Sequence, residues 1–382
     1  MLSPEIVITS DRAVSLGVQT RVAWVDIAKG WCIVLVVTMH ASLGFSLDPG
    51  PTGWLHSVVA FAKPFRMPDF FMIAGLFAST ALRLSWRIYL DRKVVHFAYF
   101  YMLWLGIVLL AKAQTLDIAS PAAFANAYLT GLVEPFSTLW FIQLLPLLFV
   151  SVRLVNRDTL AGVLFFAVSM HLLAALFPEG GVYTMSSGLT RWSTFNNFSL
   201  YFIYFLAGVL LRKQIFSFAS ASAARPVHTV SGLVIWGAIE AWAVYNGLPQ
   251  IPGLTLLFGF AGAFAIVAGS SLLARFNLMR ALAYCGQRSL YIYLSFVLPM
   301  GFARIAILKS GLISNVGWMS LIDVAIAIGA SLALYELTAH SWLAFLFKRP
   351  AFVRMPEWPA LGAGWSGAAR NQHQELGSRV LR

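Results

Sequence analysis

Apolar residues along this chain occur in runs of roughly twenty, and these runs recur between residues 27 and 347. About twenty apolar residues cross roughly 30 Å of hydrocarbon when they form an α-helix. The pattern therefore predicts an all-α, polytopic membrane protein of about ten transmembrane helices. The predicted spans are residues 27–47, 68–82, 94–113, 139–154, 160–177, 198–211, 230–245, 254–273, 290–308 and 321–347.

The polar segments lie mainly at the two ends of the chain. We expect a polar N-terminal tail over residues 1–20, one transmembrane domain over residues 21–350, and a mobile C-terminal tail over residues 351–382. Hydrophobic residues make up 59% of the chain and charged residues 11%. Soluble domains carry about 25% charged residues, so the composition leaves no room for a soluble domain.

The basic residues predict the orientation of the spans. If the N-terminus is cytosolic, 21 of the 27 Lys and Arg residues fall in the tails and loops on that side, whereas an odd number of spans or an inverted orientation spoils this asymmetry. Both termini are therefore expected in the cytosol. The net charge of +12 is explained by topology and contact with anionic membrane lipids, without a nucleic-acid partner.

The first predicted span carries ionisable residues that a membrane helix rarely tolerates. Lys29 and His40 are eleven residues apart, which places the imidazole about 16 Å deeper along a helix than the ammonium group. An ionisable side chain at such a depth is a functional-site hypothesis by default. The alternative is a neutral His40 that is hydrogen-bonded between helices. Cys32 and Cys285 are isolated, so no metal site is expected.

The pattern Asp26-x-x-Lys29-Gly30, followed after ten residues by His40, resembles the start of the acyltransferase 3 family of integral membrane O-acyltransferases. Four other short segments follow in that family's order. They are Met-Pro-Asp-Phe-Phe-Met-Ile-Ala-Gly at 67–75, Leu-Trp-Phe at 139–141, Phe-Leu-Ala-Gly at 205–208, and Gly-Gln-Arg-Ser-Leu-Tyr-Ile-Tyr-Leu at 286–294.

This resemblance implies transfer of an acyl group, commonly acetyl from acetyl-coenzyme A, to a carbohydrate hydroxyl at or beyond a bacterial-type plasma (inner) membrane. It also implies that His40 is the catalytic histidine, with Lys29 and Asp26 as the charged residues of the same motif. An imidazole can accept the proton of a sugar hydroxyl as the hydroxyl attacks the thioester. His40 could instead carry the acyl group covalently, and the sequence does not separate these routes.

Two family motifs differ in this chain. The family's Arg-x-x-Arg pattern is replaced by Lys93 and His96, with Arg92 adjacent, and these three residues are the candidates for binding the coenzyme. A basic loop that only reports topology is the alternative. Phe296 occupies the position where relatives often have a histidine after the Ile-Tyr-Leu segment.

Asp69 follows Met67-Pro68, where the family usually has an apolar residue. We expect it at a depth comparable to His40, where a carboxylate could orient the imidazole. Pairing with Arg66 is the alternative. Four other ionisable residues of the spans are expected to form hydrogen bonds between helices. They are His171, Glu240, Glu336 and His340.

Two other functional classes remain open at this point. One is a secondary transporter in which His40, Asp69 and Glu240 form a proton relay, although no internal repeat of the kind many transporters carry is visible. The other is an enzyme-like scaffold without activity. The sequence does not identify the acyl group, the acceptor glycan or the oligomeric state.

Overall fold

The computed structural model of the protein describes residues 22–45, 53–156, 158–176 and 193–355. The predicted tail at residues 1–20, and residues 356–382 of the predicted C-terminal tail, lie outside this part of the chain. Every regular element among the described residues is helical. The longer helices are α2 (Ala23–Phe45), α4 (Arg66–Ala81), α6 (His96–Ala111), α7 (Pro121–Val133), α8 (Trp140–Leu154), α9 (Leu160–Ala175), α10 (Ser193–Leu210), α11 (Arg212–Ala224), α12 (Pro226–Tyr245), α13 (Leu254–Arg275), α16 (Val297–Ser310) and α17 (Val316–Thr338). The shorter elements are α3 (Trp54–Ala62), α5 (Trp86–Leu90), α14 (Arg280–Gln287), α15 (Ser289–Ser295), the π-helical turn η1 (Asp91–Val95), and the 3₁₀ turns η2 (Ser137–Leu139), η3 (Leu248–Gln250), η4 (Trp342–Leu346) and η5 (Ala351–Val353).

The all-helical, multi-pass architecture predicted from the sequence is confirmed, whereas the count of about ten spans stays a prediction. Of the described helices, 6 are long and apolar enough to cross a membrane, and the number rises to 8 if two bent pairs are each one span. These pairs are α10 with α11, bent by 77°, and α15 with α16, bent by 56°. The predicted ten also included α4 and α9, which have 16 residues each. Sixteen helical residues extend about 24 Å, which is less than the roughly 30 Å of a hydrocarbon core.

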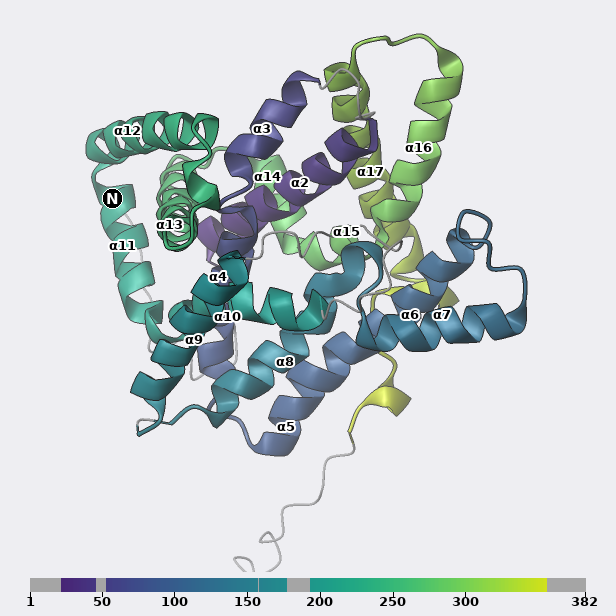
Figure 1. Cartoon of the computed structure of the whole chain (residues 1–382), viewed down its shortest axis with the longest axis horizontal. Coiled ribbons are helices and arrows are strands. Elements are labelled where there is room, and N and C mark those ends of the chain that lie inside the picture. The colour runs from purple at the N-terminus through teal and green to yellow at the C-terminus, as the bar shows by residue number, and fades with distance from the viewer. Residues whose placement is uncertain (1–21, 46–52, 157, 177–192, 356–382) are drawn as a thin grey trace, which may run out of the picture.

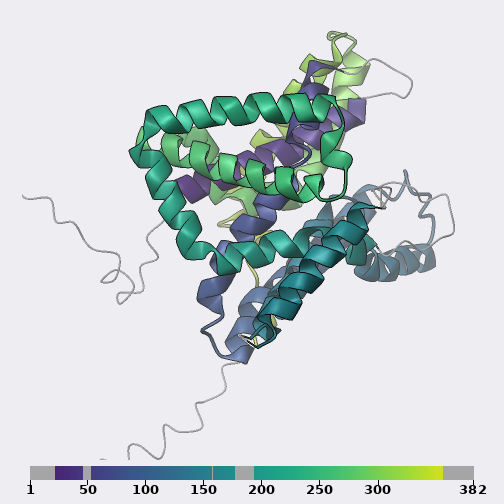
Figure 2. The ribbon, with the colours of Figure 1, turned by 60° about the vertical axis from the view of Figure 1, so that its left-hand side comes forward.

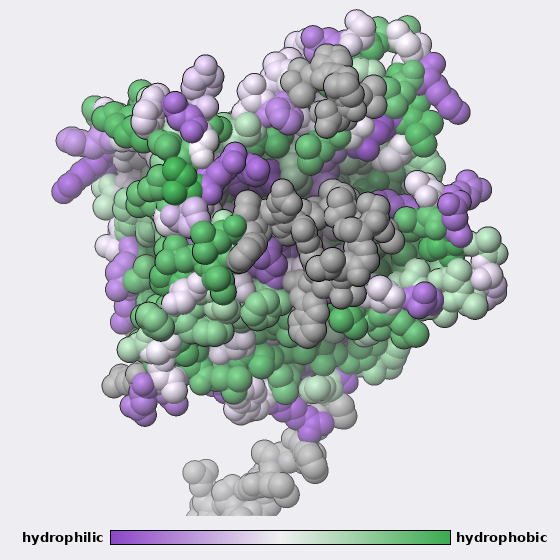
Figure 3. Space-filling view, in the orientation of Figure 1, coloured by the Kyte–Doolittle hydropathy of each residue, from purple (hydrophilic) through white to green (hydrophobic). Residues whose placement is uncertain are grey.

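Large apolar side chains cover the outside of the molecule. Figure 3 shows broad apolar areas on one face, and the exposed residues include Phe165 of α9 at 77% and Phe302 of α16 at 74%. A soluble protein rarely exposes such extended apolar areas. These surfaces fit contact with lipid chains.

Helix α2 occupies the middle of the bundle and packs against α4, α13, α14 and α17 (Figure 1). Helices α11, α12 and α13 pack together along one flank, as Figure 2 shows. The helix that carries Lys29 and His40 is therefore surrounded by protein over most of its length. Packed helices hold such side chains in fixed positions.

Glycines from the family-like segments allow two pairs of helices to approach closely. A Cβ at Gly286 would overlap the backbone carbonyl of Asp26, and one at Gly30 would overlap that of Leu282. Gly75 of α4 and Gly208 of α10 meet in the same way against the carbonyls of Phe205 and Met72. Small residues at such crossings let membrane helices pack backbone to backbone.

The remaining family-like segments meet through a buried tyrosine. The Tyr293 hydroxyl donates to the carbonyl of Thr138 and accepts the backbone N–H of Phe141 at 3.2 Å. The five segments therefore contact one another in the folded chain, although they are far apart in sequence. Most of their residues hold the helices in position, and only a few of them present ionisable groups to a site.

Candidate active site

His40 lies in the last two turns of α2, beside the break between α15 and α16. Its ring packs against Phe296, with ring centroids 5.5 Å apart. Phe296 is the residue that separates the two bent helices. The substitution of phenylalanine for the family's histidine thus leaves an aromatic ring, and not a second imidazole, next to His40.

Three cations surround the His40 imidazole. Arg66, Lys112 and Arg304 all lie within electrostatic range of its ring. Arg304 also donates a hydrogen bond of 3.1 Å to the backbone carbonyl of His40 and lies 3.6 Å from the carboxylate of Asp323. We call these five residues the histidine site. These three cations are among the six Lys and Arg residues outside the predicted cytosolic segments. Asp323 could not be predicted as a site residue because a lone carboxylate in α17 belongs to no motif.

Asp69 does not lie beside His40, contrary to the expectation from the sequence. Its carboxylate accepts a hydrogen bond of 2.8 Å from the Cys32 thiol. Cys32 precedes His40 by two helical turns, about 12 Å along α2. The alternative ion pair between Asp69 and Arg66 is not formed either, and Arg66 donates instead to the Met39 sulfur at 3.2 Å. Helix α4 therefore presents its cation, and not its carboxylate, to the histidine site.

Lys29 lies at the other end of α2. Its ammonium group is 4.6 Å from the centre of the Phe77 ring, and Asp26 acts on it electrostatically from one turn earlier in the helix. Lys93 lies within electrostatic range of Lys29. The positive charge of Lys29 thus belongs with the basic end of the molecule, and no bond joins Lys29 to His40 in the described structure.

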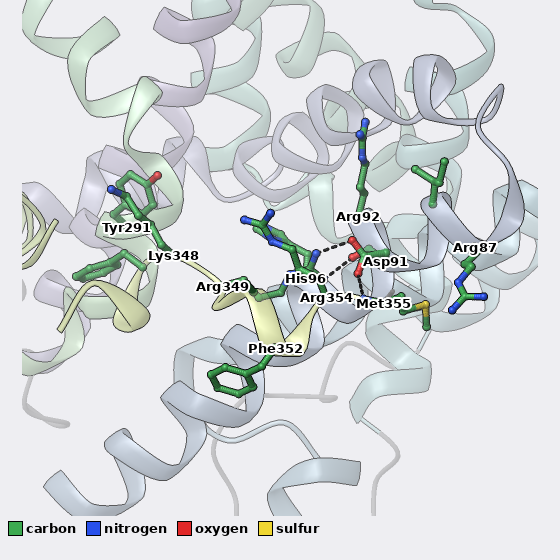
Figure 4. Close-up of a pocket in the computed structure, with 13 residues that line it drawn as sticks. Arg87, Asp91, Arg92, His96, Tyr291, Lys348, Arg349, Phe352, Arg354 and Met355 are labelled. Atoms are coloured by element: carbon green, nitrogen blue, oxygen red, sulfur yellow. Dashed lines mark hydrogen bonds and ion pairs between the residues drawn. The ribbon is translucent and has the colours of Figure 1, made fainter. Parts of the chain in front are cut away.

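A cavity of about 940 Å³ opens near this basic end, and we call it the basic pocket. Figure 4 shows that two segments distant in sequence form it, one around η1 and the other after α17. Five cations line it, together with one carboxylate, His96, Tyr291 and several apolar residues. The cations are Arg87, Arg92, Lys348, Arg349 and Arg354, and the carboxylate is Asp91.

Asp91 fastens the C-terminal wall of the basic pocket. Arg349 forms an ion pair of 2.5 Å with its carboxylate and also donates to its backbone carbonyl at 2.7 Å. The backbone N–H of Met355 donates to the same carboxylate at 2.8 Å (Figure 4). Residues 351–355, which the sequence assigned to a mobile tail, are therefore part of the described fold and complete the pocket.

The three residues predicted to bind the coenzyme are divided between two faces of one helical segment. Arg92 and His96 line the basic pocket, whereas Lys93 points to the ring of Phe149, 4.7 Å from its centre. Arg92 and Lys93 both lie in the π-helical turn η1, a type of turn frequently found at functional sites. The sequence missed Arg349 and Arg354, and the only signal was the group of basic residues directly after the last span.

The proton relay of the transporter hypothesis is not assembled in the described residues. Asp69 bonds to Cys32, His40 lies among cations, and Glu240 lies in α12 beside Trp236. The predicted bonds between helices are confirmed for two other residues. His171 bonds to the carbonyl of Leu200 at 2.8 Å, and Glu336 forms an ion pair of 3.0 Å with Arg288.

The amino-acid sequence matches a protein family and resembles a membrane protein of known sequence. A family model described as an acyltransferase domain matches residues 22–336. The inner membrane protein YcfT of Escherichia coli (strain K12) is 27% identical over 160 residues, which cover 35% of this chain and 44% of that protein. The match therefore spans less than half the length of that relative. No solved structure matches the chain.

Proposed function

The chain belongs to the acyltransferase family whose model matches most of its length, and from this premise we propose that it transfers an acyl group from acyl-coenzyme A to a hydroxyl of a carbohydrate or glycan. The donor is acetyl-coenzyme A in this proposal, and the enzyme lies in a bacterial inner membrane. The coenzyme enters from the cytosol, and the acceptor reaches His40 from the other side.

The observation that carries the proposal is the composition of the basic pocket. Its five cations face a single carboxylate, and Asp91 is already engaged by Arg349. Coenzyme A carries three phosphate groups, and guanidinium groups bind phosphates through paired, charge-assisted hydrogen bonds. A cavity of about 940 Å³ is at the upper end of the usual size for small-molecule sites, as a large nucleotide requires.

The proposed chemistry at the histidine site needs a base and a positive environment. The His40 imidazole accepts the hydroxyl proton while the hydroxyl oxygen bonds to the thioester carbon. The developing oxyanion is stabilised by the neighbouring cations, among which Arg66 and Lys112 have no carboxylate partner in the described residues. The carbon–sulfur bond then breaks, and the coenzyme thiolate takes up the proton. A covalent acyl-imidazole is the alternative route to the same products.

A donor-discharge assay tests this proposal. Full-length protein in nanodiscs is mixed with acetyl-coenzyme A and a sugar acceptor, and free thiol and acetylated sugar are measured together. We expect both products with the wild-type protein and with Arg83→Gln, which removes an exposed cation that does not line the basic pocket. A folded protein that neither binds nor discharges the donor contradicts the proposal.

A further inference from the structure

The histidine site contains a buried cation that has no counter-ion in the part of the chain that the structure describes. Arg66 is 8% exposed, and its Nε and Nη1 atoms have no hydrogen-bond partner. Its remaining nitrogen, Nη2, donates only to the thioether sulfur of Met39, at 3.2 Å. Among the described residues, no carboxylate forms an ion pair with this guanidinium group.

The surroundings of the other two cations bring no further carboxylate to Arg66. The Lys112 ammonium donates to the hydroxyl of Ser137 at 3.2 Å, which leaves its charge unneutralised. Arg304 faces the carboxylate of Asp323 and lies over Gly44, where any Cβ would overlap its guanidinium group. Arg304 is therefore held by α2 and α17, whereas Arg66 and Lys112 keep unused donors.

An arrangement of this kind is unfavourable unless an anion occupies it. Burial of a cation without a paired anion is costly, and an arginine cannot relieve the cost by losing its proton. The nearest carboxylate in the sequence of α4, Asp69, is engaged by Cys32. The fold thus holds positive charge next to the imidazole and directs the available carboxylate elsewhere.

We propose that the acceptor carries an anionic group, a carboxylate or a phosphate, beside the hydroxyl that is acylated, and that Arg66 and Lys112 bind this group. That the bound anion belongs to an acyl acceptor rests on the proposed function, whereas the binding of an anion at this position does not. Arg66 contacts Met39, the residue before His40, so a bound anion lies close to the imidazole. A guanidinium group with two free donor positions matches the paired oxygens of either anion.

A binding experiment tests the proposal without any need for turnover. Full-length protein in dodecyl maltoside is titrated with octyl β-glucuronide and with its neutral analogue octyl β-glucoside, and the thermal midpoint is followed. We expect about 10- to 100-fold tighter binding of the charged glycoside, the ratio for one or two charge-assisted hydrogen bonds. A second pair of probes, phosphatidylglycerol and a neutral galactosyl diacylglycerol, distinguishes a phosphate-bearing lipid headgroup from a sugar carboxylate.

The variants link this preference to the buried cation. In Arg66→Gln, the affinities for the charged and neutral glycosides should differ by no more than about threefold, because a charge-assisted hydrogen bond is replaced by a neutral one. Lys63→Gln should retain the full preference, because it removes an exposed cation three residues away in the chain. Arg66→Gln should also unfold at the same or a higher temperature without ligand, since it removes an uncompensated buried charge.

Equal affinity of the wild-type protein for the charged and neutral members of both pairs would overturn the proposal. An Arg66→Gln variant that keeps the preference for the charged probe and only turns over all acceptors more slowly would also overturn it. Arg66 would then stabilise only the oxyanion and would not bind an anionic group of the acceptor. If Arg66→Gln does not fold, Lys112→Gln provides the charge-removal comparison. Arg66→Lys, which keeps the charge but loses the paired donors, should then lower the preference by a smaller factor. A protein that binds the charged probes but never discharges acetyl-coenzyme A would refute the proposed function and leave the anion site in place.

Discussion

The basic pocket and the histidine site are both rich in cations, but they differ in how the charge is balanced. In the basic pocket, Asp91 pairs with Arg349 at 2.5 Å and fixes the wall that carries the remaining cations. In the histidine site, the only ion pair is the looser contact of 3.6 Å between Arg304 and Asp323, and Arg66 has none within the described residues. The first site is fixed by a tight ion pair. The second presents the Arg66 guanidinium, which no carboxylate of the described residues neutralises.

The largest expected effect is the all-or-none difference between reporters on the two sides of the membrane. It tests whether the two sites face opposite sides. Reporter fusions after residues 90, 156, 220, 283 and 360 should be cytosolic, and fusions after residues 52, 118, 185, 250 and 312 should be external, because the basic loops are retained inside. Phosphatase and fluorescence reporters at the same positions check each result. Two or more reversed positions would remove the basis of the comparison.

Substitution of His40 should give the next largest effect. If His40 is the base or the acyl carrier, His40→Ala should lower transfer by roughly 10²- to 10⁴-fold while the protein still inserts and folds. His40→Gln should be equally inactive, since an amide forms hydrogen bonds but does not accept the proton. Acyl transfer from acetyl-coenzyme A and thermal unfolding should be measured on the same preparations.

A purely structural His40 predicts the opposite pattern. The glutamine variant would then be active, and the alanine variant would lose a modest amount of stability, since a hydrogen bond between membrane helices averages about 0.6 kcal/mol. An active and well-folded His40→Gln protein is therefore incompatible with the proposed mechanism.

Removal of charge from the basic pocket should weaken donor binding selectively. The double variant Arg92→Gln/Arg354→Gln should raise the apparent KM for acetyl-coenzyme A by about 10- to 100-fold, because two charge-assisted bonds to phosphate are lost. Lys93→Gln should have a smaller effect, because Lys93 faces Phe149 and not the cavity.

Salt provides the check on this prediction. The difference between the wild-type protein and the double variant should shrink as ionic strength rises, since the pocket is open to solvent and its charges are screened. A donor KM that does not change in the double variant would show that the coenzyme binds elsewhere.

The smallest expected effect concerns the crossing that positions α2 between the two sites. Gly286→Ala should lower the free energy of unfolding by about 1–3 kcal/mol, because the added methyl group meets the carbonyl of Asp26. Gly329→Ala is the matched control, since no atom lies within 4 Å of the new methyl group. Thermal unfolding in detergent measures both. Equal midpoints would show that the two helices can separate without cost.

Long-range patterns in the sequence were sufficient for the fold class but not for the number of full spans. The apolar runs predicted a polytopic helical protein, and the order of short segments predicted the family. The count of about ten stays a prediction, because α4 and α9 are apolar but have only 16 residues each among the described residues. Length along a helix axis depends on where the helix actually ends, and hydropathy alone does not set that point.

The sites were predicted less well than the fold, for a physical reason. Helical spacing on α2 placed Lys29 and His40 at opposite ends of one helix, and this holds because both residues lie on a single element. The partner of His40 depended on how α4 crosses α2, and the crossing puts Asp69 at Cys32 and Arg66 at Met39. Arg349 reaches Asp91 from another part of the chain. Contacts between elements depend on packing angles, which a single sequence does not specify.

The ion pair between Asp91 and Arg349 also determines when the basic pocket is complete. The two residues are 258 positions apart, and Arg349 follows the last long helix of the described chain. During synthesis, Asp91 leaves the ribosome long before Arg349 and Arg354 do. A nascent or truncated chain that ends within α17 therefore has the histidine but only half of the basic pocket. If the basic pocket binds acyl-coenzyme A as proposed, only a chain whose translation has passed its last long helix can engage that donor fully.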